Sequence, residues 1–471
     1  FLENLQGVTF NQNIFSGIAP APEIESYGFQ FSNGPLNIEI DNSNTVAGVP
    51  VYYLNSAEGT VVENLDLSDA AGGTNLGCVV VNQGNGVKLR NNTIQNRPAG
   101  TAIRIYGGTN HEVSGNTISG LGLGDAINVS DDGEGIMVKN NTISDLTLGN
   151  GLLMRSCTDC ALKNNSITAL AKGTGVVVSI CTNSTVENNN ISNVRGGNGI
   201  SVGQSDGIDL LENQISDVII NIIGAEVQGI QLSTTSNVEL RDNQVSALEG
   251  ESGAQGIRLN NVTTAELVSN HISDVEATAG HASALHMATV TSAVVNRTLG
   301  SKIKAPEGFK ANCLYLEGIS DGIFQSFTCD DIGALASLNG YGVRLEAGAE
   351  SPVTLKNSIL SNIYGYGVWN HPSNEVSRLA VETSQLFDCL SGGAYNAISG
   401  FGLTDVDPVY VDAENGDYHL SPDSPSIDAA NSGAPYCNEP EPNGCRANQG
   451  VYGNTPEAGS KAGAEHCVCG E

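Results

Sequence analysis

The sequence Asn92-Thr93-Ile94 returns along the chain as Asn116-Thr117-Ile118, Asn141-Thr142-Ile143, Asn165-Ser166-Ile167, Asn189-Asn190-Ile191 and Asn213-Gln214-Ile215. The asparagines that open these copies are almost evenly spaced along the chain. A constant period of this kind, here roughly 24 residues, is typical of a solenoid in which each repeat forms one coil. A single coil cannot bury its own apolar face, so we expect the hydrophobic core to form between stacked coils.

A second apolar segment occurs once in each repeat and begins at a small residue. Its copies are Ala102-Ile103, Ala126-Ile127, Gly151-Leu152, Gly175-Val176, Gly199-Ile200, Gly229-Ile230 and Gly256-Ile257. Short β-branched runs bounded by Gly, Asn, Asp and Ser indicate strands, and no helical periodicity accompanies them. The sequence therefore predicts an all-β protein with a parallel β-helix over residues 36–400, an N-terminal cap over 1–35 and an irregular C-terminal cap over 401–471.

The repeated asparagine has a structural explanation. Asparagine tolerates the backbone of tight turns, and its amide can bond to the equivalent amide in the coil above and the coil below. A row of such amides satisfies buried turn groups that would otherwise be costly. We therefore expect one line of side chains along one edge of the stack, with no chemical role, formed by Asn92, Asn116, Asn141, Asn165, Asn189 and Asn213.

The charge balance limits the classes of partner. The chain of 471 residues has 51 Asp and Glu against 20 Lys and Arg, a net charge of −31. Such acidity argues against binding to nucleic acid and to anionic membrane surfaces. No run of about 18 apolar residues is present, so we expect no membrane span.

Three stretches resemble known families. The Asn-centred repeats resemble the secreted right-handed parallel β-helix superfamily, which includes pectate-lyase-like enzymes and carbohydrate-binding surface proteins. The stretch 48–54, Gly-Val-Pro-Val-Tyr-Tyr-Leu, resembles the opening coils of its carbohydrate-binding and sugar-hydrolase type. The stretch 416–429, which contains Gly-Asp-Tyr-His-Leu-Ser-Pro and Ser-Pro-Ser-Ile-Asp-Ala, resembles the C-terminal closing segment of secreted bacterial β-helix proteins. The resemblance implies right-handed coils and an extracellular or cell-surface bacterial protein.

Two disulfides are predicted among the 11 cysteines. Cys437 and Cys445 flank a Pro-rich loop, which suits a disulfide-closed turn. Cys157 and Cys181 are separated by one full repeat and occupy matching places in adjacent coils. Because stacked strands lie about 4.8 Å apart, within the reach of a disulfide, we expect Cys437–Cys445 and Cys157–Cys181 pairs.

Two further cysteine patterns have more than one interpretation. The motif Cys157-x-x-Cys160 can also be a metal or redox pair, although no second pair and no nearby histidine accompanies it. The motif Cys467-x-Cys469 fits a disulfide to an upstream cysteine, an intermolecular bridge or a soft-metal pair.

The repeats lengthen after Asn213. The interval from Asn213 to Asn243 and the interval from Asn243 to Asn270 are both longer than any earlier one. Since the strands must stay in register, the extra residues go into turns, and loops on a rigid scaffold often carry function. We therefore expect the functional half to lie at about residues 225–400.

One outward-facing column of side chains follows from the alternation of a β-strand. It runs through Arg104, Asn128, Leu153, Val177, Ser201, Gln231, Arg258, His286, Tyr315, Arg344 and Trp369, and a second outward column adds Asn260, Glu317, Glu346 and His371. The last five members of the first column would span about 19 Å at about 4.8 Å per rung. Outward residues of any solenoid are polar, so a solvated face is the alternative to a ligand-binding face.

A polysaccharide that lay along this column could stack its sugar rings on aromatic side chains and pair its charged groups with arginines. Trp369 and Tyr315 can stack on sugar faces, while Arg258 and Arg344 can pair with uronate carboxylates or sulfates. In a β-eliminating lyase or a C5-epimerase, an arginine would neutralise the carboxylate, and His286 or Tyr315 would exchange the C5 proton.

A glycoside hydrolase would need two facing carboxyl groups, and Glu317 with Glu346 is the best pair on offer. The stretch 199–203 resembles a strand of polygalacturonases. Asn198, however, stands where that family has histidine, and its paired aspartates are missing.

The sequence offers two candidate turns for calcium. Asp131, Asp132 and Glu134 form a carboxylate-rich turn, and Asp206 with Asp209 forms another. Neither turn follows an established loop spacing, so solvated turns are the simpler interpretation.

Two function classes follow. The first is a non-catalytic extracellular or cell-surface β-helix that binds polysaccharide or associates with copies of itself. The second is a secreted polysaccharide lyase or C5-epimerase that acts on uronate-containing glycans. The missing family motifs and the acidity favour the first, and the outward Arg and His side chains favour the second or glycan binding by the first.

Overall fold

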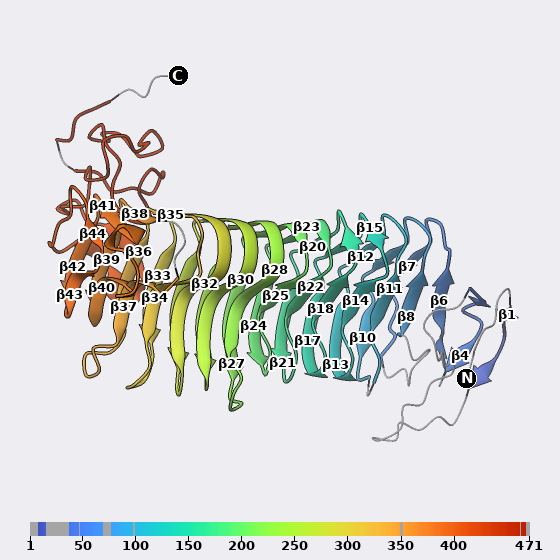
Figure 1. Cartoon of the computed structure of the whole chain (residues 1–471). Coiled ribbons are helices and arrows are strands. Elements are labelled where there is room, and N and C mark those ends of the chain that lie inside the picture. Colours follow the sequence, from blue (N-terminus) through green and yellow to red (C-terminus); the bar gives the residue numbers. More distant parts are fainter. Residues whose placement is uncertain are drawn as a thin grey trace. The chain divides into compact units, whose positions relative to one another are not determined.

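The computed structural model describes residues 8–15, 37–46, 48–68, 77–97, 99–348, 352–461 and 463–467. These residues form strands that stack as successive rungs, with two 3-10 turns, η1 (Val376–Arg378) and η2 (Ala413–Asn415) (Figure 1). Contacts divide the chain into two compact units, residues 1–219 (unit 1) and 220–471 (unit 2). The predicted all-β parallel β-helix is confirmed, and the predicted boundaries at 35/36 and 400/401 stay predictions. No helix in the described part of the chain is long and apolar enough to cross a bilayer.

Three ladders of parallel strands build unit 1. The first consists of β6 (Tyr52–Asn55), β8 (Val79–Asn82), β11 (Ile103–Tyr106), β14 (Ile127–Ser130), β18 (Leu152–Arg155), β22 (Val176–Ser179) and β25 (Ile200–Gly203). The second consists of β7 (Val61–Glu63), β9 (Lys88–Arg90), β12 (Glu112–Ser114), β16 (Met137–Lys139), β20 (Ala161–Lys163), β23 (Thr182–Glu187) and β26 (Asp206–Leu211), with β15 (Gly133–Glu134) and β19 (Cys157–Thr158) before two of them. The third consists of β10 (Thr93–Gln95), β13 (Thr117–Leu123), β17 (Thr142–Leu148), β21 (Ser166–Leu170), β24 (Asn190–Arg195) and β27 (Gln214–Ile220).

The core of unit 1 is a stack of identical aliphatic contacts. The isoleucine that closes each repeated phrase pairs in register with the isoleucine of the next coil, as Ile94 does with Ile118 and Ile118 with Ile143. All of them are almost completely buried. Burial of one such side chain stabilises the fold by about 1.5–3 kcal/mol, so the repeated phrase supplies the core as well as the period.

The small residue of each coil is explained by the same isoleucine. A Cβ added at Gly151 would lie 2.7 Å from Cγ2 of Ile167, and one added at Gly175 would lie 2.5 Å from Cγ2 of Ile191. These approaches are too close for a larger side chain. The two sequence segments of one coil therefore pack against each other across the interior of the β-helix.

The predicted line of asparagines is present, and it is buried. In each pair the Nδ2 group donates to Oδ1 of the next asparagine, at 3.0 Å from Asn92 to Asn116, 2.9 Å from Asn116 to Asn141 and 3.0 Å from Asn141 to Asn165. The tight turn belongs instead to the preceding residue, for example Asn140 with φ of 56° and Asn164 with φ of 56°. Two neighbouring residues thus share the two roles that the sequence suggested for one asparagine.

The described N-terminal residues make short pairings. β1 (Thr9–Phe10) pairs in parallel with β3 (Glu39–Ile40), and β2 (Ile14–Phe15) with β4 (Thr45–Val46). β4 pairs antiparallel with β5 (Val49–Pro50), and β3 pairs antiparallel with β6. The predicted capping role of residues 1–35 falls largely outside the described residues.

Unit 2 continues the three-ladder plan with longer strands. The first ladder consists of β28 (Val227–Arg241), β30 (Gly253–Val268), β32 (His281–Asn296), β34 (Ala311–Glu317), β37 (Gly340–Leu345), β40 (Gly365–Asn370) and β43 (Gly392–Tyr395). The second has β35 (Gly322–Gln325), β38 (Val353–Lys356), β41 (Leu379–Glu382) and β44 (Ile398–Ser399). The third has β29 (Gln244–Gly250), β31 (His271–Ala277), β33 (Leu299–Lys304), β36 (Thr328–Ile332), β39 (Ile359–Ile363) and β42 (Gln385–Cys389).

The C-terminal segment folds back onto the coils of unit 2. Its hairpin, β45 (Tyr410–Asp412) and β46 (Asp417–Leu420), contributes Leu420 to a small core that also contains Ile359 and Ile427. Tyr418 Oη donates to the carboxylate of Asp330 at 3.3 Å. Further along, the backbone N–H of Val451 donates to Thr328 Oγ1 at 2.9 Å. The segment is therefore anchored by both apolar and polar contacts.

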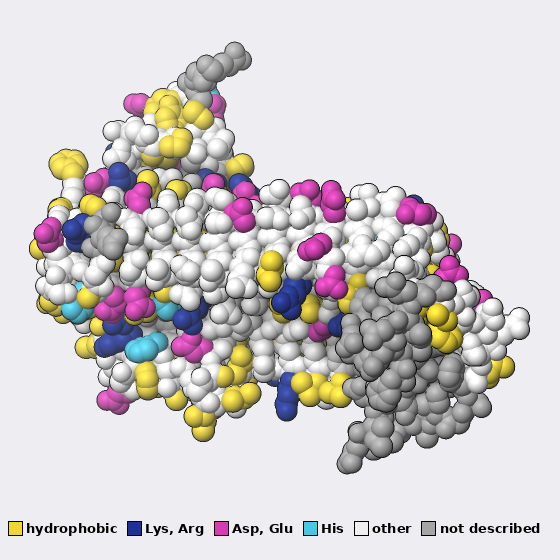
Figure 2. Space-filling model, turned by 45° about the vertical axis from the view of Figure 1, so that its right-hand side comes forward, with side chains coloured by type: hydrophobic (Ala, Val, Ile, Leu, Met, Phe, Trp, Pro, Cys, Tyr) yellow, Lys and Arg dark blue, Asp and Glu magenta, His cyan; other side chains and the backbone are white. Residues whose placement is uncertain are grey.

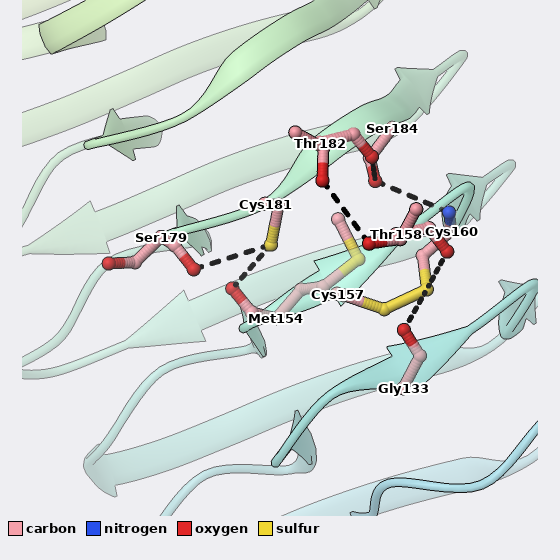
Figure 3. Close-up of a disulfide and its surroundings, with 9 residues drawn as sticks. All are labelled: Gly133, Met154, Cys157, Thr158, Cys160, Ser179, Cys181, Thr182 and Ser184. Atoms are coloured by element: carbon pink, nitrogen blue, oxygen red, sulfur yellow. Dashed lines mark hydrogen bonds between the residues drawn. A yellow bond between two sulfur atoms is a disulfide. The ribbon is translucent and has the colours of Figure 1, made fainter.

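The predicted Cys157–Cys181 disulfide is wrong, because Cys157 is bonded to Cys160 (Figure 3). The rung assignment itself holds, since the neighbouring Thr158 and Thr182 pair between strands. The side chain of Cys181 is a free buried thiol, and its Sγ donates to the carbonyl oxygens of Ser179 (3.3 Å) and Met154 (3.6 Å).

The predicted Cys437–Cys445 disulfide is also wrong. Cys445 is bonded to Cys467, and Cys437 takes part in a separate disulfide. The reason is local pairing: the N–H of Gly444 donates to the carbonyl of Glu465 at 2.9 Å, which brings the stretch around Cys467 beside Cys445. Of the interpretations of the Cys467-x-Cys469 motif, a disulfide to an upstream cysteine is the one found for Cys467.

Candidate functional site

The outward column of unit 2 lies in register. Five residues, Arg258, His286, Tyr315, Arg344 and Trp369, are direct pairing partners on β30, β32, β34, β37 and β40. The column begins at Gln231 on β28 and extends one rung beyond the prediction, to Tyr395 on β43. The part of the predicted column in unit 1, to which no function was assigned, is likewise in register. It consists of Arg104, Asn128, Leu153, Val177 and Ser201.

The second outward column places acidic groups beside the first. Glu317 follows Tyr315 on β34 by two residues and pairs with no charged residue on β32, where Ala288 is its partner. The N–H of Glu346 donates to the carbonyl of Leu316, so Glu346 stands one rung further. The side chain of Glu317 is 56% exposed and that of Glu346 only 19%.

Arg344 lies among three aromatic rings. Its guanidinium carbon lies 5.2 Å from the ring centroid of Tyr315, 5.3 Å from that of Tyr341 and 5.4 Å from that of Trp369. The side chain is 18% exposed and pairs with Glu346. A guanidinium held over an aromatic face gains about 0.5–2 kcal/mol, depending on how far it is desolvated. The three rings and the carboxylate therefore fix the orientation of this arginine.

The aromatic surface is larger than the sequence analysis predicted. Tyr341 and Tyr366 pair on adjacent rungs with ring centroids 6.3 Å apart, and Tyr395 stacks on Trp369 at 6.3 Å with an interplanar angle of 10°. A signal was present in the sequence, because Gly340-Tyr341-Gly342-Val343 returns one coil later as Gly365-Tyr366-Gly367-Val368. His371 meets the Trp369 ring edge-on at 5.6 Å.

Both arginines of the column already have carboxylate partners. Arg258 pairs with Glu226 at 2.5 Å, and Arg344 pairs with Glu346. Glu226 lies 32 residues before Arg258 and was not among the predicted site residues. A carboxylate on a ligand would consequently have to compete with these glutamates.

His286 is a neutral, nearly buried imidazole. Its side chain is 11% exposed, and its Nε2 has no hydrogen-bond partner within the described structure and lies 3.8 Å from the carboxylate of Glu317. Burial, together with the positive charge of Arg258, lowers the pKa of His286 to about 3. The contact with Glu317 is therefore not an ion pair at neutral pH.

Tyr315 is a protonated phenol in the same place. Its ring lies 4.6 Å from that of His286. Burial raises its pKa, and the negative charges of Glu317 and Glu346 raise it further. At neutral pH the phenol can donate a hydrogen bond to a ligand but does not act as a strong base.

Figure 2 shows where charged groups gather on one face of the molecule. Dark blue, magenta and cyan side chains lie mixed together at the lower left of this view, whereas the middle of the view is mostly white. Positive and negative side chains therefore lie close together on this face of the molecule.

The residues of the first candidate calcium turn lie at the surface. Asp131, Asp132 and Glu134 are exposed turn and strand-end residues. Within the described ranges, the one group of three side chains with ligand atoms in reach of a single ion is Cys445, Glu465 and Cys467, and two of these form a disulfide. Calcium binding at these turns stays the alternative to the solvated turns that the sequence favours.

The comparison with family models identifies the fold. The right-handed β-helix region matches residues 47–215, 125–293 and 217–380, which together cover well over half of the chain. The chain belongs to the family of proteins with a right-handed β-helix region. A comparison with curated proteins gave no match.

Solved structures with a similar course of the chain are distant. The A-module of a mannuronan C-5 epimerase from Azotobacter vinelandii is 12% identical, with a TM-score of 0.41, over 78% of this chain and 85% of that one. Pectate lyase Pel9A is 10% identical, with a TM-score of 0.39, over 94% and 96%. The tailspike protein of E. coli bacteriophage HK620, in complex with pentasaccharide, is 10% identical, with a TM-score of 0.35, over 69% of each chain. No activity is transferred from similarity at this level.

Proposed function

We propose that the chain binds polysaccharide along the outward column of unit 2. The observation that carries the proposal is the register of six consecutive rungs, which hold Arg258, His286, Tyr315, Arg344, Trp369 and Tyr395 in one line. Aromatic faces are stacking surfaces for sugar rings, and a row of them at about 4.8 Å per rung suits an extended chain of sugars.

The ion pairs of the column favour recognition through stacking and hydroxyl contacts. Arg258 and Arg344 are neutralised by Glu226 and Glu346. A neutral sugar can contact the exposed parts of the Trp369 and Tyr395 rings, which stack on each other, without breaking either ion pair. A uronate would bind only where its carboxylate gains more than the glutamate that it displaces.

The alternative is a polysaccharide lyase or C5-epimerase, with Arg258 or Arg344 neutralising the carboxylate. The pKa values of its two proton-transfer candidates are shifted away from neutral pH. The pKa of His286 is lowered to about 3, and that of Tyr315 is raised. Efficient general catalysts have pKa values near the working pH. Binding is for this reason the better-supported proposal, and catalysis is tested beside it. The carboxyl pair of Glu317 and Glu346 stays the candidate for hydrolysis.

We also propose an extracellular or cell-surface location. The disulfides Cys157–Cys160, Cys313–Cys329 and Cys445–Cys467 support it, because disulfides persist in oxidising environments. Self-association of the chain stays a prediction.

Affinity electrophoresis against a panel of neutral, uronate-containing and sulfated polysaccharides tests the binding proposal. Trp369→Ala and Arg344→Ala should each weaken binding at least tenfold, since a stacked ring or fixed guanidinium contributes about 1.4 kcal/mol or more. Val177→Ala is the matched control, because Val177 occupies the same outward column in unit 1. Absence of binding to every glycan, or equal loss in the control, would refute the proposal.

The enzyme alternative has its own readout. The parent protein is incubated with the uronate-containing glycans, and unsaturated sugars are followed by their absorbance. Turnover that His286→Ala or Tyr315→Phe abolishes while binding persists would replace the binding proposal by a lyase, because a proton-transfer group acts mainly in the transition state. Absence of turnover in the parent leaves the binding proposal in place.

A further inference from the structure

A polar pocket lies on unit 2, and none of its lining residues belongs to the outward column. It has a volume of about 250 Å³ and lies between the coil edge, at Asn296, Arg297, Gln325 and Lys356, and the C-terminal segment, at Asn431 and Asn454. Pockets for drug-sized ligands usually measure about 300–1,000 Å³, so this pocket suits a small ligand such as one sugar ring.

The pocket floor is built by strand register. Asn296, Gln325 and Lys356 are pairing partners on β32, β35 and β38, which stacks their side chains on three successive rungs. The side-chain amides of Asn296 and Gln325 make no hydrogen bond to another described residue. Such amides offer both donors and acceptors, as sugar hydroxyl groups require.

The opposite wall is held in place. The N–H of Asn431 donates to Oδ1 of Asn357 at 2.7 Å, which joins the C-terminal segment to the coil edge. Buried Glu439 accepts the N–H groups of Asn448 and Asn454, each at 2.7 Å. The pocket is therefore pre-formed by contacts that do not involve its own free groups.

The charges that line the pocket are both positive. Lys356 has Glu382 at 3.4 Å, but Arg297 has no carboxylate oxygen within 4.0 Å among the described residues. The Nε group of Arg297 donates to Ser269 Oγ at 3.3 Å. Burial lowers the pKa of Arg297, with Asp242 opposing this at longer range. An unpaired, half-buried guanidinium in a chain of net charge −31 points to an anionic partner from outside the chain.

The turn itself gives no reason for an arginine at this position. Arg297 has φ of 49°, in the left-handed region, where the equivalent position of other coils has Asn164, Asn188, Glu212, Asp242, Ser269 or Ser326. Asn and Asp tolerate this conformation better than longer side chains do. Arginine is therefore not the residue type that this backbone favours, and the turn alone does not account for it.

We propose that this pocket, referred to here as the Arg297 pocket, binds a monosaccharide-sized sugar acid. The carboxylate would pair with Arg297, with Lys356 nearby, and the ring hydroxyls would bond to the amides of Asn296 and Gln325. A planar guanidinium binds a carboxylate through two parallel hydrogen bonds, which a neutral sugar cannot form. The proposal is independent of polysaccharide binding on the outward column.

Isothermal titration of the whole chain with D-glucuronate tests the proposal. D-glucose, inorganic sulfate and inorganic phosphate are the comparison ligands. The parent should bind glucuronate at least tenfold more tightly than any of the three. Binding of glucose as tight as that of glucuronate would show that charge is not recognised, and equal binding of sulfate or phosphate would show a bare-oxyanion site. Either result overturns the proposal, as does absence of glucuronate binding.

The variant test uses two substitutions at one position and a matched arginine. Arg297→Gln should weaken glucuronate binding at least tenfold, and Arg297→Asn should do the same while leaving the melting temperature unchanged or higher. Arg241→Gln is the control, because Arg241 is already paired with Glu239. Trp369→Ala should leave glucuronate binding intact, which separates this site from the outward column. Parent-like binding by both Arg297 variants would refute the proposal.

Discussion

Replacement of Asn189 by alanine tests the buried line of amides at a single rung. Oδ1 of Asn189 accepts the backbone N–H and the Nδ2 group of Asn165 at 3.0 and 2.9 Å. Its own Nδ2 donates to the carbonyl of Leu162 at 2.9 Å and to Oδ1 of Asn213 at 3.0 Å. The same Nδ2 also donates to the carbonyl of Glu187 at 3.2 Å. Alanine removes these five bonds together, and the partner groups stay buried.

The expected magnitude follows from the groups left without a partner. The backbone N–H of Asn165 loses its acceptor, whereas Nδ2 of Asn165 keeps the carbonyl of Val138 and Oδ1 of Asn213 keeps the backbone N–H of residue 189. A buried unpaired polar group costs about 1–3 kcal/mol, which is the destabilisation expected here. That is a sizeable part of the ~5–15 kcal/mol by which a domain is usually stable.

Hydrogen exchange is the suitable assay, because each coil of a solenoid contacts only its neighbours and global unfolding need not be two-state. Amides of β21 and β24 should exchange at least tenfold faster in Asn189→Ala, since about 1.4 kcal/mol corresponds to one decade. Asn190→Ala is the control, because Asn190 is the exposed neighbour on β24. Exchange within threefold of this control would refute the reasoning.

The remaining predictions concern the C-terminal segment and the core. Burial raises the pKa of Glu439 from 4.5 to about 7, so its contribution to stability is complete below pH 4.5 and is lost as pH rises through about 7. Thermal melts of Glu439→Gln should lack this decline, and an unchanged decline would contradict the prediction. Gly175→Ala should destabilise unit 1 by about 1–3 kcal/mol in denaturant titrations, because the new Cβ meets Ile191. Peptide mapping of the unreduced protein should recover Cys445 linked to Cys467, and a Cys437–Cys445 peptide would disprove that pairing.

The register of the fold was predictable because one short sequence motif recurs in every coil of unit 1. Once Ile103 and Ile105 are placed inward, alternation makes Arg104 point outward, and the period carries that assignment along the coils to the line from Arg258 to Trp369. Lengthened coils did not disturb this, since their extra residues lie in turns. The sequence therefore contained the columns.

The contacts within the columns were less predictable. Glu226 reaches Arg258 from a position 32 residues earlier, a distance that no periodic pattern connects. The disulfide predictions were wrong for a similar reason. The period places Cys157 and Cys181 on adjacent rungs, but it does not give the direction of either side chain. Tyr341 and Tyr366 were missed although their Gly-Tyr-Gly repeat was visible.

The amide line of unit 1 also has a consequence for how such a chain changes length. Every asparagine presents the same donor to the next coil and the same acceptor to the previous one, as Asn141 and Asn165 do. If one whole repeat were deleted, the asparagines on either side of it could bond to each other in the same way. If one were duplicated, the added asparagine could bond to both of its neighbours, so no amide in the line would lack a partner. Loss or gain of one coil should therefore cost unit 1 little polar pairing, whereas deletion of the coil that carries Tyr315 would place Arg344 beside His286 in the outward column.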